Sequence, residues 1–95
     1  MPVLHIEHPI TDIDTWRDAF NRFATVRRRA GVTSERVWQP DDDPRYIVVD
    51  LEFEAASSAA DFRTFLRERV WSSPDAAPGL AGSPRAVILS EIATA

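Results

Sequence analysis

The sequence contains no cysteine, and motifs that define several common enzyme classes are also missing. Without thiols there can be no disulfide, no thiolate nucleophile and no thiolate metal site. There is no glycine-rich phosphate loop, no G-x-S-x-G motif and no H-E-x-x-H motif. These motifs carry nucleotide binding, serine-hydrolase chemistry and zinc chemistry. We therefore expect neither a metal nor a cofactor.

Long apolar runs and an excess of positive charge are missing as well. No stretch approaches the roughly 20 apolar residues that a transmembrane helix needs, and the first residues do not resemble a secretory leader. The formal net charge of -4 disfavours a general attraction to nucleic-acid phosphates. We expect a cytoplasmic protein that binds neither membranes nor nucleic acid.

The chain is predicted to form one domain, residues 1–95, because its 44% hydrophobic residues suffice for a modest core. Two amphipathic helices are indicated, one from near Asp12 to Gly31 and one from Ser58 to about residue 73. Each begins beside a short oxygen-bearing side chain that can cap it, with Thr11 and Asp14 forming the first capping signal. Alternating apolar residues predict strands over 3–8, 33–39, 45–53 and 85–93.

The resulting order βαββαβ predicts an α+β, ferredoxin-like fold, in which a four-stranded antiparallel sheet carries two helices on one face. The apolar residues at 47, 49, 51 and 53 share one face of the longest strand and should lie under the helices. The other face is left uncovered. It is expected to carry His5 and Glu7 from the first strand, and Tyr46 and Asp50 from the third.

The two histidines of the chain lie in the first strand, where alternation puts His5 and His8 on opposite faces. We take His5 as the pocket-facing residue and candidate general base, because its unperturbed pKa lies near neutrality. The alternative register would instead place His8 on that face. Glu7 and Asp50 are expected near His5, either to hold its ring or to form ion pairs across a dimer interface.

Several other polar and aromatic residues can be interpreted either as structural or as functional. Trp71 and Tyr46 could stack on a flat substrate, or could belong to the core or to an interface. The basic run of residues 27–29 is interpreted as a solvated cap at a helix end, although residue 27 falls in the apolar stripe. The acidic run of residues 41–43 reads as a tight turn, since it lacks the spaced ligands of a calcium loop.

This arrangement resembles the dimeric α+β barrel superfamily, which includes antibiotic-biosynthesis-monooxygenase-like and stress-responsive barrel-like proteins. The resemblance covers nearly the whole chain. It rests on a first strand ending in His8 and Pro9, a Trp-bearing first helix, a hairpin, a Phe-rich second helix ending in Trp71, a loop and a last strand. It implies a homodimer in which two open sheets pack face to face.

The resemblance also implies roles for individual residues. Trp71 matches a substrate-positioning Trp of the cofactor-free quinone-forming monooxygenases, and Tyr46 and Arg85 could supply their Tyr and Arg. The position that carries Asn in those enzymes holds Arg67 here. The haem-ligating His of related haem-degrading enzymes has no counterpart. His5 resembles the first-strand base of polyketide cyclases, whose second His is missing.

The sequence therefore predicts a cofactor-free small-molecule enzyme that acts on an aromatic or polyketide-like substrate in a cavity between sheet and helices. His5 and Arg85 are the candidate catalytic residues. The candidate substrate-binding residues are Tyr46, Trp71, Arg67, Asp50 and Glu7. Two alternatives remain open, a polyketide cyclase or isomerase, and a non-catalytic ligand-binding or structural homodimer.

Overall fold

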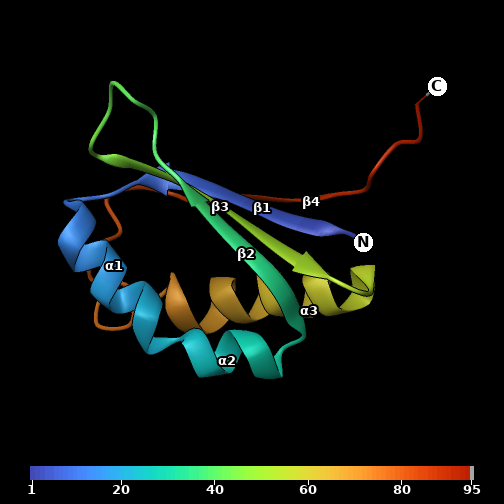
Figure 1. Ribbon diagram of the computed structural model, residues 1–95. Helices are drawn as coiled ribbons and strands as arrows, with labels where there is room; N and C mark the ends of the chain where they lie inside the picture. The colour runs from blue at the N-terminus through green and yellow to red at the C-terminus, as the bar shows by residue number, and fades with distance from the viewer. Residues whose placement is uncertain (95) are drawn as a thin grey trace.

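The computed structural model describes residues 1–94, which form one sheet backed by helices (Figure 1). In chain order the elements are β1 (Val3–Pro9), α1 (Ile13–Arg22), α2 (Ala24–Arg29), β2 (Val32–Trp38), β3 (Tyr46–Phe53), α3 (Ala56–Phe65), a π-helical turn η1 (Leu66–Val70) and β4 (Arg85–Leu89). The predicted α+β, ferredoxin-like fold is confirmed.

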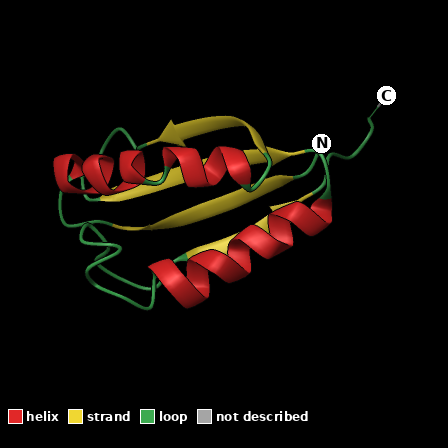
Figure 2. Cartoon of the chain, turned by 90° about the horizontal axis from the view of Figure 1, so that it is seen from below, coloured by secondary structure: helices red, strands yellow, loops and turns green. Residues whose placement is uncertain are grey.

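The sheet has the strand order β2-β3-β1-β4, and every neighbouring pair is antiparallel. β1 and β3 therefore lie in the centre, and β2 and β4 form the edges. The helices cover one face of the sheet (Figure 2). No element within residues 1–94 covers the other face, which we call the open face.

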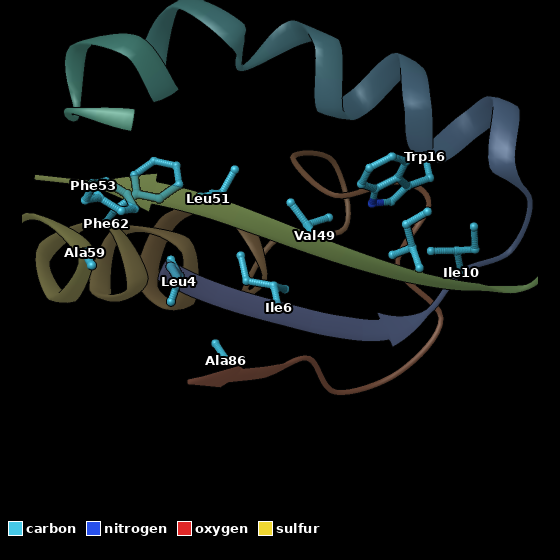
Figure 3. Packing of buried hydrophobic residues seen from close by; sticks show 11 residues of the cluster. Leu4, Ile6, Ile10, Trp16, Val49, Leu51, Phe53, Ala59, Phe62 and Ala86 are labelled. Carbon is cyan, nitrogen blue, oxygen red and sulfur yellow. The ribbon is translucent and has the colours of Figure 1, made fainter. Parts of the chain in front are cut away.

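The core lies between the sheet and the helices, and it is built by strand alternation (Figure 3). Leu4, Leu51 and Phe53 are at most 1% exposed, and Phe62 of α3 packs on them from the helix layer. Burying one such side chain stabilises the fold by roughly 1.5–3 kcal/mol. The predicted apolar face of β3 is confirmed, since residues 47, 49, 51 and 53 are all buried.

The first helical region differs from the prediction of one continuous helix. It consists of α1 and α2, because Phe23 leaves the helical conformation with φ -97° and ψ 11°. The Phe20 carbonyl near this break accepts the Phe23 N–H at 3.2 Å and also a hydrogen bond from the Arg27 guanidinium. The N-cap of α1 is Asp12, which accepts the Thr15 N–H at 2.8 Å, rather than Thr11.

Three further boundaries were predicted with different success. Gly31 follows α2 with φ +103°, a conformation that favours glycine, so the predicted helix stop is confirmed. α3 begins at Ala56 rather than at Ser58, and no side chain caps it, because its N-cap residue is Ala55, which has no side-chain acceptor. β4 ends at Leu89 rather than at residue 93. Leu89 pairs with Val3, the first residue of β1, so pairing with β1 ends there.

None of the helices in residues 1–94 is long and apolar enough to cross a membrane.

Candidate functional site

The alternation of β1 separates its two histidines onto the two faces of the sheet. His8 pairs with Ile47 and points toward the helices, and only 5% of its surface is exposed. His5 pairs with Asp50 and lies on the open face. The register that places His5 on the uncovered side is therefore the one the structure adopts.

A hollow on the helix side of the sheet, which we call the helix-side cavity, is mostly apolar. Its volume is about 80 Å³, and it opens to solvent. This is smaller than the roughly 150 Å³ of a cavity that holds benzene, so a ring-sized ligand must extend beyond it toward solvent. Its lining includes His8, Trp16, Phe20, Arg27, Leu66 and Trp71.

His8 presents a neutral imidazole to this cavity. Its Nδ1–H donates to the carbonyl oxygen of Pro9 at 2.9 Å, which fixes the tautomer and leaves the lone pair on Nε2. Burial lowers the pKa of His8, and the hydrogen bond to Pro9 opposes this only in part. The ring is therefore uncharged at neutral pH and can accept a proton from a molecule in the cavity.

Arg27 is the second polar group of the cavity, and it is 4% exposed. Its Nε donates to Glu35 at 2.7 Å, and one terminal nitrogen donates to the Phe20 carbonyl at 2.5 Å. Its guanidinium also lies 3.6 Å from the centroid of the Phe20 ring. The prediction that residues 27–29 form a solvated cap is thus wrong for Arg27, because the helix stripe turns this residue inward.

Trp71 reaches the cavity through the π-helical turn η1. The backbone N–H of Trp71 bonds to the carbonyl of Leu66 at 2.7 Å, five residues back, in place of the usual spacing of four. The extra residue changes the direction in which the following side chains point. Val70 and Trp71 both line the cavity.

The loop between η1 and β4 closes one side of the cavity with small residues, among them Ala76, Ala77 and Gly79. The loop is fixed to the segment that leads into α1, since the Thr11 N–H donates to the Gly79 carbonyl at 2.9 Å. A Cβ on Gly79 would lie 2.7 Å from the Cα of Trp16. Glycine is required here for the loop to approach the helix so closely.

On the open face, His5 is held between two carboxylates. Its Nδ1 lies 2.6 Å from Asp50 Oδ1, and its Nε2 lies 2.7 Å from Glu7 Oε2. A carboxylate accepts and does not donate, so both ring nitrogens must carry protons for both bonds to form. Partial burial alone would lower the pKa of His5, but the hydrogen bonds and charges of Glu7 and Asp50 outweigh it and raise the pKa.

Further side chains extend this arrangement into the open-face cluster, formed by His5, Glu7, Trp38, Tyr46, Asp50 and Arg85. Tyr46 donates to Glu7 Oε1 at 2.9 Å, and Trp38 Nε1 donates to Asp50 Oδ2 at 3.1 Å. Arg85 lies 3.8 Å from Glu7. The hydrogen bond from His5, and then that from Tyr46, lowers the pKa of Glu7, while the bond to Glu7 raises the pKa of Tyr46.

The predicted site residues do not gather around one cavity. Trp71 lines the helix-side cavity, whereas His5, Tyr46 and Arg85 belong to the open-face cluster on the opposite side of the sheet, together with Glu7 and Asp50. Arg67 is exposed on η1. The expectation that these side chains border one cavity is wrong within a single chain, because residues of equal parity on a strand share a face.

The two polar residues of the helix-side cavity, His8 and Arg27, were not predicted as site residues. Both carried a sequence signal. His8 has the same parity as Leu4 and Ile6, and Arg27 occupies a position in the apolar helix stripe. A polar residue at a position of an otherwise apolar strand face or helix stripe is therefore the sequence signal that could have indicated these two cavity residues.

Within residues 1–94, no group of three or more His, Cys, Asp or Glu side chains is arranged to hold a metal ion.

No family model and no curated protein matches this sequence. Solved structures do match its fold. A protein described as an antibiotic biosynthesis monooxygenase from Nitrosomonas europaea has 20% sequence identity and a TM-score of 0.69, over 98% of this chain and 100% of that one. The chain has an antibiotic biosynthesis monooxygenase-like fold.

Two further proteins with this fold have more specific descriptions. SnoaB from Streptomyces nogalater, a cofactor-independent oxygenase, has 14% identity and a TM-score of 0.72, over 98% of this chain and 94% of that one. The ActVA-Orf6 monooxygenase of Streptomyces coelicolor, solved with nanaomycin D, has 21% identity and a TM-score of 0.63, over 99% and 89%. At these identities the likeness shows the fold alone, so activity must be argued from the site.

Proposed function

We propose that the protein is a cofactor-free enzyme that takes a small hydroxyaromatic or polyketide-like molecule into the helix-side cavity and removes a proton from it with His8. The observation that carries this proposal is the free Nε2 lone pair of a neutral imidazole beside an apolar, aromatic-lined hollow. A proton acceptor in such surroundings can take a proton from the bound molecule and so promote the formation of its enolate or phenolate.

Oxygenation is the reaction that we favour. An electron-rich enolate can react with molecular oxygen without a cofactor. One solved structure of this fold is described as a cofactor-independent oxygenase and another as a monooxygenase. For an anthrone-like substrate the balance is one substrate and one O₂ giving one quinone and one water. Trp71 and Phe20 would form walls for the flat ring, and the Arg27 guanidinium lies on the same hollow.

The test is oxygen uptake and quinone absorbance with anthrone as the probe, for the wild type and for His8→Gln. We expect the variant to lose at least about tenfold in kcat, because a positioned base contributes typically 10²–10⁴-fold. Activity should also fall as the pH drops through the lowered pKa of His8, since the protonated ring cannot accept a proton. Arg85→Gln, on the opposite face, should retain turnover. Loss in Arg85→Gln with retention in His8→Gln would contradict this placement of the reaction.

A cyclase or isomerase is the second candidate, because the His8 lone pair serves an intramolecular condensation as well as it serves oxygenation. The oxygenase and the cyclase or isomerase can be distinguished because only the oxygenase requires molecular oxygen. Turnover that continues in an anaerobic chamber would favour the cyclase, and turnover that stops would favour the oxygenase.

We also propose that the protein is a homodimer joined through the open face. Two large apolar side chains on this face, Trp38 and Leu89, are 50% and 47% exposed. Trp38 shares this face of β2 with Arg36, and Leu89 shares this face of β4 with Arg85, a mixture of apolar and charged groups that suits a surface that pairs with itself. The non-catalytic reading, in which this interface is the main role of the protein, would gain if no turnover or ligand binding is found.

A further inference from the structure

The open face carries an almost balanced set of charges. In the strand register, Arg36 of β2 lies beside Asp50 of β3, and Asp50 lies beside His5 of β1. Glu7 and Arg85 are opposite one another on β1 and β4. Together with Glu52, whose side chain points the same way, the charged groups of this face in the described strands are three carboxylates, two guanidinium groups and the imidazole of His5.

The imidazole therefore decides the net charge of the open face. With His5 protonated, three negative groups face three positive ones and the face is neutral. With His5 neutral, each copy carries one uncompensated negative charge. A surface that meets its own copy must be complementary to itself, so an excess of one sign repels the second copy, and this repulsion grows when water is excluded.

The geometry shows which form the folded chain accommodates. Both ring nitrogens of His5 lie within 2.7 Å of carboxylate oxygens. In a neutral ring, one nitrogen would turn its lone pair toward an anionic oxygen, which is repulsive. The side chains of His5, Glu7 and Asp50 are already only 20–30% exposed in one chain.

We propose that the open face binds a second copy of this chain when His5 is protonated in both copies. Formation of the dimer therefore takes up protons, and the affinity of the two copies depends on the charge of the His5 ring. The inference rests on the proposed homodimer. The groups that face His5 are Glu7 on its own strand and Asp50 on β3. Its β4 neighbour, Val87, does not titrate. Tyr46 and Arg85 act through Glu7, and Trp38 acts through Asp50.

The experiment is sedimentation equilibrium of the whole protein between pH 5.5 and 8.5 at constant ionic strength. We expect the dimer Kd to rise by at least about tenfold across this range, since two protons are linked to each dimer. His5→Gln should dimerise weakly at every pH, because it fixes the uncompensated negative charge. His8→Gln, which alters the other histidine on the opposite face, should keep the pH dependence of the wild type.

A double variant tests the charge count directly. His5→Gln combined with Asp50→Asn removes one cation and one anion, so the open face carries no net charge from pH 5.5 to 8.5. We expect this variant to dimerise with a Kd that does not change with pH, and circular dichroism checks that it is folded. A wild-type dimer whose Kd is constant from pH 5.5 to 8.5 would overturn the proton linkage while leaving the homodimer intact. A monomer at every pH would overturn the homodimer itself.

Discussion

Arg27 and His8 are the buried polar side chains within residues 1–94, and each is held by a backbone carbonyl, Phe20 for Arg27 and Pro9 for His8. Strand parity in the sequence already grouped His8 with the core residues of β1. The alternation of side chains along β1 does not indicate on which side of the sheet a cavity forms. That side depends on how helices far along the chain pack. Strand alternation therefore placed the two histidines correctly on opposite faces, but His8, and not the predicted His5, lines the helix-side cavity.

Replacing Arg27 by Ala should lower the free energy of unfolding by about 1–3 kcal/mol. The substitution removes the bonds to Glu35 and to the Phe20 carbonyl, and it removes the contact with the Phe20 ring. Urea denaturation measures the change. Arg28→Ala is the matched control, since Arg28 is exposed on the same helix and should change stability by less than about 0.5 kcal/mol. Equal effects of the two substitutions would contradict the bonding described for Arg27.

Among the secondary-structure elements, the strands were predicted most closely. Alternation along β1 and β3 specifies both the strands and their buried faces, because one face must meet the helices. The break between α1 and α2 was not predicted, because the apolar stripe continues through Phe23. The spacing of apolar residues does not indicate where the backbone changes direction. The π-helical turn was missed for the same reason. The end of β4 depends on where its partner β1 begins, which is a tertiary property.

The loop before β4 can be tested by Gly79→Ala. The added methyl would lie 2.7 Å from Trp16 Cα and 2.9 Å from Trp16 N, so either the loop or α1 must shift. We expect the free energy of unfolding to fall by about 1–3 kcal/mol, the usual cost of overpacking, and the binding of anthrone to become weaker. Thermal unfolding and a fluorescence titration measure the two effects. Ser83→Ala, at an exposed position of the same loop, should leave both unchanged. Wild-type stability in Gly79→Ala would show that the contact with α1 is not tight.

For the whole molecule, the fold class was predictable because the order of elements, the capping signals and the apolar faces agree with one another. The two histidines then give the stability of the molecule opposing pH dependences. The pKa of His5 is raised, so its contribution to stability is fully present below about 6.5 and is lost as the pH rises through the folded value. The pKa of His8 is lowered, so its contribution is lost as the pH falls below 6.5.

The acid side of this profile can be assigned to His8. Between pH 7.5 and 5.5 the wild type should lose stability relative to His8→Gln, because unfolding releases a ring that then takes up a proton. The slope of the difference can reach at most about 1.4 kcal/mol per pH unit. Urea midpoints at fixed protein concentration measure it. A difference between wild type and variant that does not change with pH would mean that His8 binds protons equally in the folded and unfolded protein, which would contradict its lowered pKa.

The three tryptophans are divided between the two faces of the sheet, and this makes the chain its own optical reporter. Trp16, which is stacked on Phe20, and Trp71 both line the helix-side cavity, whereas Trp38 is half exposed on the open face. A water-soluble quencher should therefore reach Trp38 first, and a flat ligand should mainly affect Trp16 and Trp71. Variants that keep one tryptophan each would let emission from the two faces of the sheet be read separately, so that ligand entry and association of two copies can be timed in the same sample without an attached dye.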